Sequence, residues 1–175
     1  MNENVSVTRE ISAPADRVWE MVSDLPRMGE WSPENEGGVW LKGADGPKEG
    51  VKFRGSNRHG KRKWKTIATI IDAEPGRKLT FRITVMGIPD SEWSYDLKPT
   101  DGGCHVTESW TDQRPGWFKP LTALVSGVSD RETHNRAGME QTLEALKAAA
   151  ENKLKSKHLI QFTEELSDLL SAGVN

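Results

Sequence analysis

The sequence has a single cysteine, Cys104, and contains no CxxC or HExxH pattern. One thiol cannot form a disulfide within the chain, and the four histidines are too widely separated to indicate a metal site. No apolar run approaches the roughly 18 residues that a membrane-spanning helix needs. The first residues, MNENVSVTRE, lack the pattern of a secretory signal. We therefore expect a cytoplasmic protein without a membrane span or a bound metal.

Phosphate-binding loops, dinucleotide fingerprints and GxSxG elbows are also missing. These motifs hold nucleotide cofactors or present a nucleophilic serine, so the sequence predicts no cofactor and no covalent acyl transfer. The 24 Lys and Arg residues against 26 Asp and Glu residues give a net charge of −2 and a pI near 6.1. This balance produces no general attraction to an anionic membrane, and we expect no nucleic-acid partner.

Tryptophan is abundant, with seven Trp against four Phe and one Tyr. A chain of 175 residues forms one domain, or one domain with an appendage, and can enclose a small cavity.

Alternating apolar residues, separated by turn-forming residues, predict strands. The predicted strands are 5–12, 39–43, 50–57, 63–74, 77–85, 91–99 and 104–112. Their short connections indicate an antiparallel meander.

Helices are predicted on either side of these strands. The stretch 12–26 has apolar residues at helical spacing and ends at a proline. From Phe118 to Leu154, apolar residues recur at about 100° per residue, which indicates one long amphipathic helix that SGVSD, residues 126–130, could interrupt. The fold class is therefore α+β, with a curved sheet packed against the C-terminal helix.

Several passages resemble one known superfamily. They are ISAPADRVWEMVSDLPRMGEWSP, FRGSNRHGKRKW, EPGRKLTF, WSYDLKP, GGCHVTESW and HNRAGMEQTLEALKAAAE. These passages are similar to parts of the SRPBCC or START-like superfamily, in particular its polyketide cyclase/dehydrase branch. The resemblance implies a helix-grip fold, in which an antiparallel sheet of seven or so strands wraps around the long C-terminal helix and leaves a hollow for apolar molecules. Lipid binders and aromatase/cyclases both belong to this superfamily, so binding and catalysis both stay open.

The hairpin over residues 50–66 indicates which side chains face that hollow. Because side chains alternate along strands, one face carries four candidate ligand contacts: Phe53, Gly55, Asn57 and Trp64. A two-residue turn in RHGK would put Gly55 near Trp64, where the missing side chain makes room for an indole or a ligand. The alternative is that Gly55 marks a β-bulge, which would invert the assigned faces.

The same alternation selects residues of the later strands. It places four aromatic candidates on the inner face: Phe81, Trp93, Tyr95 and Trp110. Glu108 belongs to this face and has apolar neighbours on either side. It is either paired with an Arg or Lys of a neighbouring strand or points into the hollow with a raised pKa. In the second case Glu108 is a candidate general acid or base.

The long helix adds polar residues to an apolar stripe. With Leu121 as the reference, Glu132 and Asn135 lie on the same side of the helix as Met139. Glu132 is then a second catalytic candidate, and Asn135 and Met139 are candidate ligand contacts. The alternative is that a kink near SGVSD turns Glu132 and Asn135 toward solvent and His134 inward.

Two further features favour contacts with other proteins. The tip of one hairpin gathers five basic residues: Arg58, Lys61, Arg62, Lys63 and Lys65. Either this tip is only a solvated turn, or it attracts an acidic partner such as a carrier protein. Beyond a helix-grip domain of residues 1–155, the segment 156–175 carries a seam of Leu159, Phe162, Leu166 and Leu169. We expect a second amphipathic helix there, which would pack on the sheet, pair with another copy in a homodimer or be an added extension.

The sequence therefore predicts a protein that binds a small apolar molecule, such as a lipid, a polyketide or an aromatic compound, in an internal cavity. A cyclase or dehydratase is the alternative, in which Glu108 or Glu132 moves a proton while the cavity folds a poly-ketone chain. The groups that would then hydrogen-bond the enolate oxygen are Asn57, Asn135 and Tyr95. A third hypothesis is a protein-interaction module that uses the basic hairpin or the C-terminal helix.

Overall fold

The computed structural model describes residues 3–172, apart from the side chains of residues 153–155 and 169–172. Its sheet consists of β1 (Asn4–Ile11), β2 (Asn35–Trp40), β3 (Lys52–His59), β4 (Arg62–Glu74), β5 (Lys78–Val85), β6 (Ile88–Thr100) and β7 (Gly103–Asp112). The helices are α1 (Ala15–Ser23), the 3-10 helix η1 (Leu25–Glu30), α2 (Lys119–Ser126) and α3 (Arg131–Ala172). All pairs are antiparallel in the order β1-β7-β6-β5-β4-β3-β2, so the predicted meander and the α+β class are confirmed.

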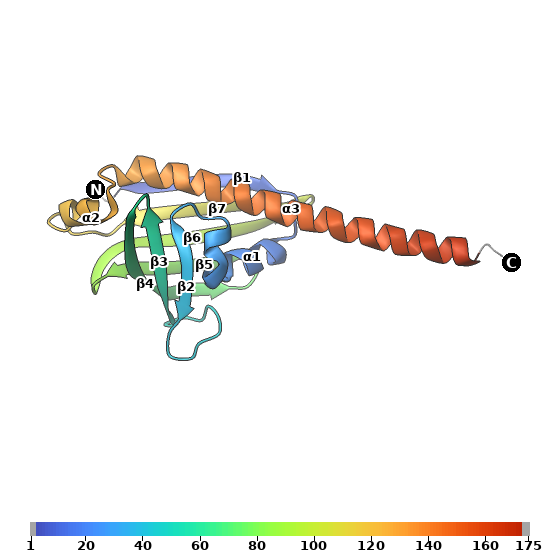
Figure 1. The fold of residues 1–175 in the computed structure, drawn as a ribbon, viewed down its shortest axis with the longest axis horizontal. Coiled ribbons are helices and arrows are strands. Elements are labelled where there is room, and N and C mark those ends of the chain that lie inside the picture. Colours follow the sequence, from blue (N-terminus) through green and yellow to red (C-terminus); the bar gives the residue numbers. More distant parts are fainter. Residues whose placement is uncertain (1–2, 173–175) are drawn as a thin grey trace.

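The sheet curves around the first part of α3, which runs alongside β1 (Figure 1). Met139, Leu143, Leu146 and Ala150 of α3 are fully buried at a spacing of three and four residues, so one stripe of the helix faces the sheet. This stripe joins the core formed by apolar residues of β1, α1 and the inner face of the other strands. A sheet that wraps around a C-terminal helix in this way is the predicted helix-grip fold.

β2 begins at Asn35, earlier than the predicted residue 39. The prediction missed its first residues because the two glycines weaken the strand pattern of the sequence. Both glycines are required by close contacts of the backbone. A Cβ on Gly37, which has a φ of 85°, would lie 2.2 Å from the carbonyl oxygen of Pro26 in η1. A Cβ on Gly38 would lie 2.1 Å from the carbonyl oxygen of Arg54. The glycines therefore let β2 pack between η1 and β3, with a register shift between Asn35 and Gly38.

The predicted C-terminal helix is interrupted at SGVSD, which is the break that the sequence left open. Gly127 ends α2 in the left-handed conformation, with φ 77°, and its N–H donates to the carbonyl oxygen of Ala123. Asp130 then starts α3, because its Oδ1 accepts a hydrogen bond from the N–H of Thr133 at 3.0 Å.

The C-terminal segment is not a separate helix. It continues α3 without interruption and extends past the sheet, away from the domain (Figure 1). Leu159, Phe162 and Leu166 are exposed, so they do not pack on the sheet, and the side chain of Leu169 lies outside the described ones. None of the helices within the described residues is both long and apolar enough to cross a membrane.

We predict that deletion of residues 156–175 leaves the domain folded. The described side chains from residue 156 onward are exposed, so their loss should change the free energy of unfolding by less than about 1 kcal/mol. Any dimer held by the stripe of Leu159, Phe162 and Leu166 should dissociate. Chemical denaturation and light scattering measure both effects. A deletion that begins at Leu143 is the contrasting control and should unfold the chain, and unfolding of the shorter deletion would show that the tail belongs to the core.

Candidate functional site

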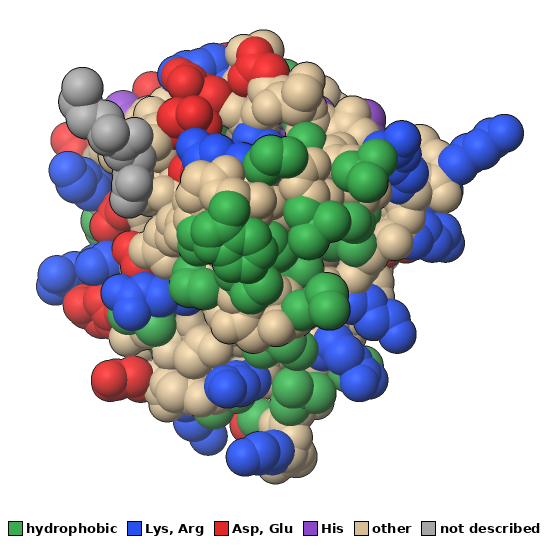
Figure 2. All heavy atoms as spheres, turned by 90° about the vertical axis from the view of Figure 1, so that its left-hand side faces the viewer, with side chains coloured by type: hydrophobic (Ala, Val, Ile, Leu, Met, Phe, Trp, Pro, Cys, Tyr) green, Lys and Arg blue, Asp and Glu red, His purple; other side chains and the backbone are tan. Residues whose placement is uncertain are grey.

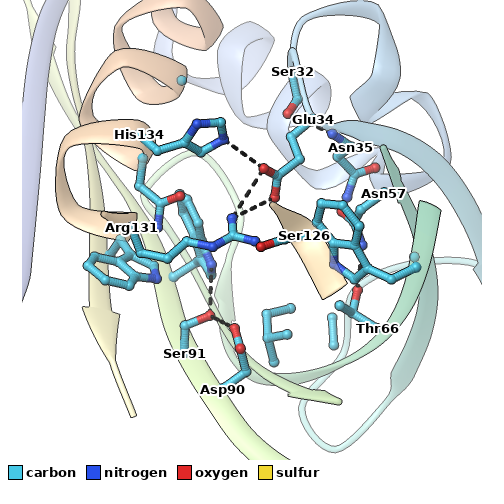
Figure 3. A pocket seen from close by; sticks show the side chains of 18 of the residues that line it. Ser32, Glu34, Asn35, Asn57, Thr66, Asp90, Ser91, Ser126, Arg131 and His134 are labelled. Carbon is cyan, nitrogen blue, oxygen red and sulfur yellow. Dashed lines mark hydrogen bonds and ion pairs between the residues drawn. The ribbon is translucent and has the colours of Figure 1, made fainter. Parts of the chain in front are cut away.

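A cavity of about 370 Å³ lies between the inner face of the sheet and the helices (Figure 3). This volume falls within the range of small-molecule sites in proteins. All ten residues predicted as ligand contacts line it: Phe53, Gly55, Asn57, Trp64, Phe81, Trp93, Tyr95, Trp110, Asn135 and Met139. The alternation of side chains therefore predicted cavity residues on five strands, and α3 adds two more. Their contact with a ligand stays a prediction.

The β3–β4 hairpin has a different register from the expected one. The turn lies at Gly60 and Lys61, so Gly55 is opposite Thr66 and Asn57 is opposite Trp64. The shift is two residues, which leaves every side chain on its predicted face. Pairing continues through Gly55 without a bulge, and a Cβ there would lie 3.1 Å from Thr66 Oγ1. Asn57 is buried and donates from Nδ2 to the same oxygen at 3.1 Å.

Glu108 projects from β7 into the cavity and is 3% exposed. Its Oε1 accepts a hydrogen bond of 2.7 Å from the hydroxyl of Tyr95, which lies opposite it on β6. Its Oε2 is buried and has no hydrogen-bond partner among the residues that the structure describes. The salt bridge to a neighbouring Arg or Lys, one of the two alternatives from the sequence, is not formed.

Burial raises the pKa of Glu108 to about 8, and the hydrogen bond from Tyr95 offsets only part of this effect. Burial likewise raises the pKa of Tyr95, and the nearby Glu108 adds to the increase. At neutral pH both groups are therefore largely protonated. A neutral carboxyl whose Oε2 faces the cavity can donate a hydrogen bond to an oxygen of a ligand.

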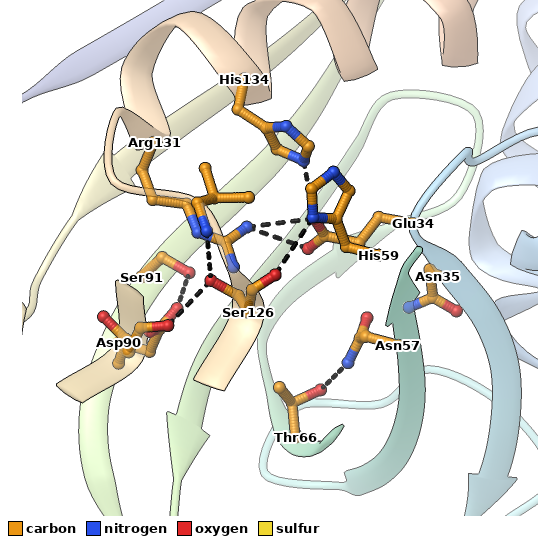
Figure 4. A network of polar contacts seen from close by, with 12 residues as sticks. Glu34, Asn35, Asn57, His59, Thr66, Asp90, Ser91, Ser126, Arg131 and His134 are labelled. Carbon is orange, nitrogen blue, oxygen red and sulfur yellow. Dashed lines mark hydrogen bonds and ion pairs between the residues drawn. The ribbon is translucent and has the colours of Figure 1, made fainter. Parts of the chain in front are cut away.

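A second polar group in the cavity centres on Glu34 (Figure 4). Its carboxylate accepts hydrogen bonds from Arg131 Nη1 at 3.0 and 3.1 Å and pairs with His134 Nε2 at 2.8 Å. Burial alone would raise the pKa of Glu34, but the hydrogen bonds from His134 and Arg131 outweigh it and the pKa is lowered. The site thus holds an ionised carboxylate as well as the neutral Glu108.

The same group joins α3 to the β3–β4 hairpin. The guanidinium of Arg131 lies over the ring of Trp64, with 5.6 Å from Cζ to the ring centroid. The rings of His59 and His134 meet edge to face, with centroids 5.0 Å apart. His59 Nδ1 also lies 3.1 Å from the carbonyl oxygen of Ser126 at the end of α2. Sequence reasoning did not select Glu34, Arg131 or His59, because these residues come from three separate segments.

Glu132 was predicted to face the hollow but is exposed and does not line the cavity. Glu132 and Met139 both belong to α3, so the break at Gly127 does not change the angle between them. Glu132 lies in the first turn of the helix, where its side chain is exposed. His134 lines the cavity, as the kinked alternative predicted. Asn135 is buried in the cavity wall, which agrees with the unkinked prediction and not with that alternative. Of the two predicted carboxyl candidates for acid/base chemistry, Glu108 therefore lines the cavity and Glu132 does not.

Residues Asp90 and Ser91 form a third polar position on β6. Trp93 Nε1 donates to Ser91 Oγ at 3.2 Å, and Ser91 Oγ donates to Asp90 Oδ2 at 2.9 Å. Burial raises the pKa of Asp90 although the hydrogen bond from Ser91 opposes this. Among the described residues, no three His, Cys, Asp or Glu side chains are grouped so that they could hold a metal ion.

Residues 3–151 match the family described as polyketide cyclase / dehydrase and lipid transport. The match covers most of the chain, so the protein belongs to this family, and the relationship indicated by the sequence motifs is confirmed. The helical extension after residue 151 lies outside the match.

Solved structures show the same fold. A polyketide-cyclase-like protein from Corynebacterium glutamicum is 29% identical, over 90% of this chain and 97% of that chain, with a TM-score of 0.63. A protein from Nitrosomonas europaea is 15% identical, over 87% and 96% of the two chains, with a TM-score of 0.64. The di-domain ARO/CYC StfQ from the steffimycin biosynthetic pathway is 14% identical, over 89% of this chain and 52% of that chain, with a TM-score of 0.69. No curated protein matches the sequence.

Proposed function

We propose that this protein binds a small, largely apolar molecule in the cavity and that an oxygen of this molecule accepts a hydrogen bond from Glu108. The observation that carries the proposal is the carboxyl of Glu108, which lies in the wall of an aromatic cavity and whose buried Oε2 has no hydrogen-bond partner among the described residues. Buried polar groups are rarely left unsatisfied. A ligand carbonyl or hydroxyl oxygen would satisfy this one. The free, buried thiol of Cys104 suits the cytoplasmic location expected from the sequence.

The second candidate function is cyclisation or dehydration of a poly-ketone. A carboxyl with a pKa of about 8 is largely protonated at neutral pH, and it loses and regains a proton readily in that range. Glu108 would then act as a general acid toward an oxygen of the substrate, with Tyr95 supporting its carboxyl group. Turnover of a bound poly-ketone that disappears in Glu108→Gln, while binding persists, would support catalysis over binding alone.

We predict that Gly55→Leu weakens binding of the neutral apolar dye N-phenylnaphthylamine about tenfold or more. The added side chain would occupy part of the cavity beside Phe53 and Thr66, where a Cβ meets Thr66 Oγ1 at 3.1 Å. The backbone of Gly55 does not have a positive φ, so leucine adds no backbone strain at this position. Dye fluorescence, together with quenching of the protein's tryptophans, gives the affinity.

The matched control is Gly46→Leu. Gly46 also lacks a positive φ, and a Cβ there would meet no atom within 4 Å. This variant should bind the dye as the wild type does. Absence of dye binding to the wild type would contradict the proposed apolar site, and equal binding by a folded Gly55→Leu variant would remove Gly55 from it.

A further inference from the structure

The short helix α2 exposes its apolar side and buries its polar side. Leu121, Leu124 and Val125 are exposed, whereas Thr122 and Ser126 are buried. A surface helix of a globular domain ordinarily does the reverse. The apolar side of α2 therefore lacks a partner within the described part of the chain.

Polar contacts hold α2 in this orientation. Arg114 Nη1 donates to Thr122 Oγ1 at 2.9 Å, and Thr122 Oγ1 in turn donates to the carbonyl oxygen of Lys119. At the other end of the helix, His59 contacts the carbonyl oxygen of Ser126, and Arg62 donates to that of Leu124. The exposure of the apolar side is thus fixed by hydrogen bonds on the opposite side.

Two residues outside α2 complete an exposed apolar surface at this end of the molecule. Met86 in the β5–β6 turn is 92% exposed, and Trp117 before α2 is 68% exposed. We call the five residues Met86, Trp117, Leu121, Leu124 and Val125 the mouth patch. Figure 2 shows hydrophobic side chains gathered at the centre of this end of the molecule. Met86, Leu121 and Val125 also line the cavity, so the patch surrounds an entrance to it.

Basic side chains lie beside the mouth patch. The β3–β4 hairpin, whose tip carries Lys61 and Arg62, contacts α2 through Arg62. Lys61 is exposed and forms no ion pair among the described residues. Lys and Arg side chains border the hydrophobic centre on the right and below in Figure 2. The net charge of −2 gives no overall attraction to anions, so any attraction must come from this local arrangement.

We propose that the mouth patch docks on the surface of an anionic lipid bilayer. Its aromatic and aliphatic side chains would enter the boundary between head groups and acyl chains, and the basic hairpin would face the anionic head groups. A symmetric dimer through the patch is disfavoured, because it would bring the basic hairpins of both copies to one interface. The cavity entrance would then open toward the bilayer, and an apolar molecule could exchange without crossing water. This last role rests on the proposed function, whereas the docking itself does not.

The test is co-sedimentation with vesicles of phosphatidylcholine alone or mixed with phosphatidylserine. Wild-type protein should sediment with the mixed vesicles, and high salt should weaken this binding. Leu124→Glu should bind these vesicles at least about tenfold more weakly than the wild type. Lys61→Glu should bind several-fold more weakly. The matched controls are Val39→Glu, an exposed apolar position on β2, and Lys98→Glu on β6, and both should bind as the wild type does.

Three outcomes would overturn the docking. They are no sedimentation of the wild type, equal binding by Leu124→Glu and the controls, or a dimer in solution that Leu124→Glu dissociates, which would assign the patch to a second copy. Leu124 does not line the cavity, so N-phenylnaphthylamine binding should be unchanged in Leu124→Glu. If the wild type binds the dye but does not bind vesicles, only the docking is refuted. Absence of dye binding to the wild type refutes the proposed function instead.

Discussion

Glu108→Gln is expected to increase the free energy of unfolding near neutral pH by an amount on the order of 3 kcal/mol. The carboxyl has a pKa of about 8 in the folded protein and an ordinary value of 4.5 in the unfolded chain. The unfolded chain can therefore ionise Glu108 at pH 7, whereas the folded protein keeps it largely protonated. Glutamine removes this difference because it does not ionise, and its amide oxygen can still accept the hydrogen bond from Tyr95.

The pH dependence identifies the cause. A raised pKa in the folded state means that the wild type is most stable, with respect to this group, below pH 4.5 and loses that stability as the pH rises to about 8. The difference between Glu108→Gln and the wild type should therefore grow over this range and level off above it. Chemical denaturation at several pH values measures it.

The control for this substitution is Glu92→Gln on the outer face of β6. Glu92 is paired with Arg82 at 2.7 Å and is not enclosed in the cavity. Its replacement should change stability little, because ion pairs near the surface contribute little. Destabilisation by Glu108→Gln at neutral pH would contradict the neutral carboxyl and would indicate an ionised Glu108 with a cationic partner.

Glu108→Leu separates stability from binding. Leucine cannot hydrogen-bond, so a ligand oxygen would lose its donor, whereas glutamine can still supply one through Nε2. A ligand with an oxygen acceptor should therefore bind Glu108→Leu more weakly than Glu108→Gln. Equal affinities for the two variants would exclude a hydrogen bond from residue 108.

The inner face of the sheet could be predicted from sequence because alternation along a strand depends only on parity. The β3–β4 register differed by two residues from the expected one, and Gly55 and Trp64 still face the cavity. Glu108 was selected by the same rule. What it contacts could not be predicted, since its partner Tyr95 depends on the pairing of β6 with β7.

Other parts of the site depend on contacts between distant segments. Glu34 lies in a stretch that reads as a connection, and its contacts with Arg131 and His134 arise only when α3 crosses the sheet. Sequence periodicity places Glu132 on the side of α3 that carries Met139, but it does not show that the first turn of the helix is exposed there. The two glycines of β2 resemble a turn for a related reason, because Gly37 is required by the close approach of η1 and Gly38 by that of β3.

Asp112→Asn is expected to destabilise the protein by about 3 to 5 kcal/mol. Asp112 ends β7, and its side chain is 1% exposed. It accepts hydrogen bonds from Arg114 Nε and Nη2, both at 2.9 Å, and from the N–H of Arg114 at 3.0 Å. Lys119 Nζ lies 2.8 Å from Oδ2. Asparagine would leave the buried guanidinium of Arg114 without its counter-charge.

The contribution of Asp112 should also be visible in the decrease of stability at acidic pH. Burial opposes ionisation of Asp112, but the hydrogen bonds from Arg114 and Lys119 outweigh it and hold the pKa at about 2. Because the folded pKa lies below the ordinary value of 3.8, this stabilisation is present above pH 3.8 and is lost as the pH falls toward 2. Asp112→Asn should lack this part of the acid dependence.

A double substitution distinguishes the ion pair from simple packing. Asp112→Asn combined with Arg114→Met removes both charges, so it should be less destabilising than the sum of the single substitutions. Arg114 also donates a hydrogen bond to Thr122 of α2. Loss of the Arg114 side chain should therefore loosen α2 and reduce the binding of vesicles by the mouth patch. Chemical denaturation at pH 7 measures the three variants. If the losses of stability were additive, Asp112 and Arg114 would act independently, and this result would contradict the two side-chain hydrogen bonds between them.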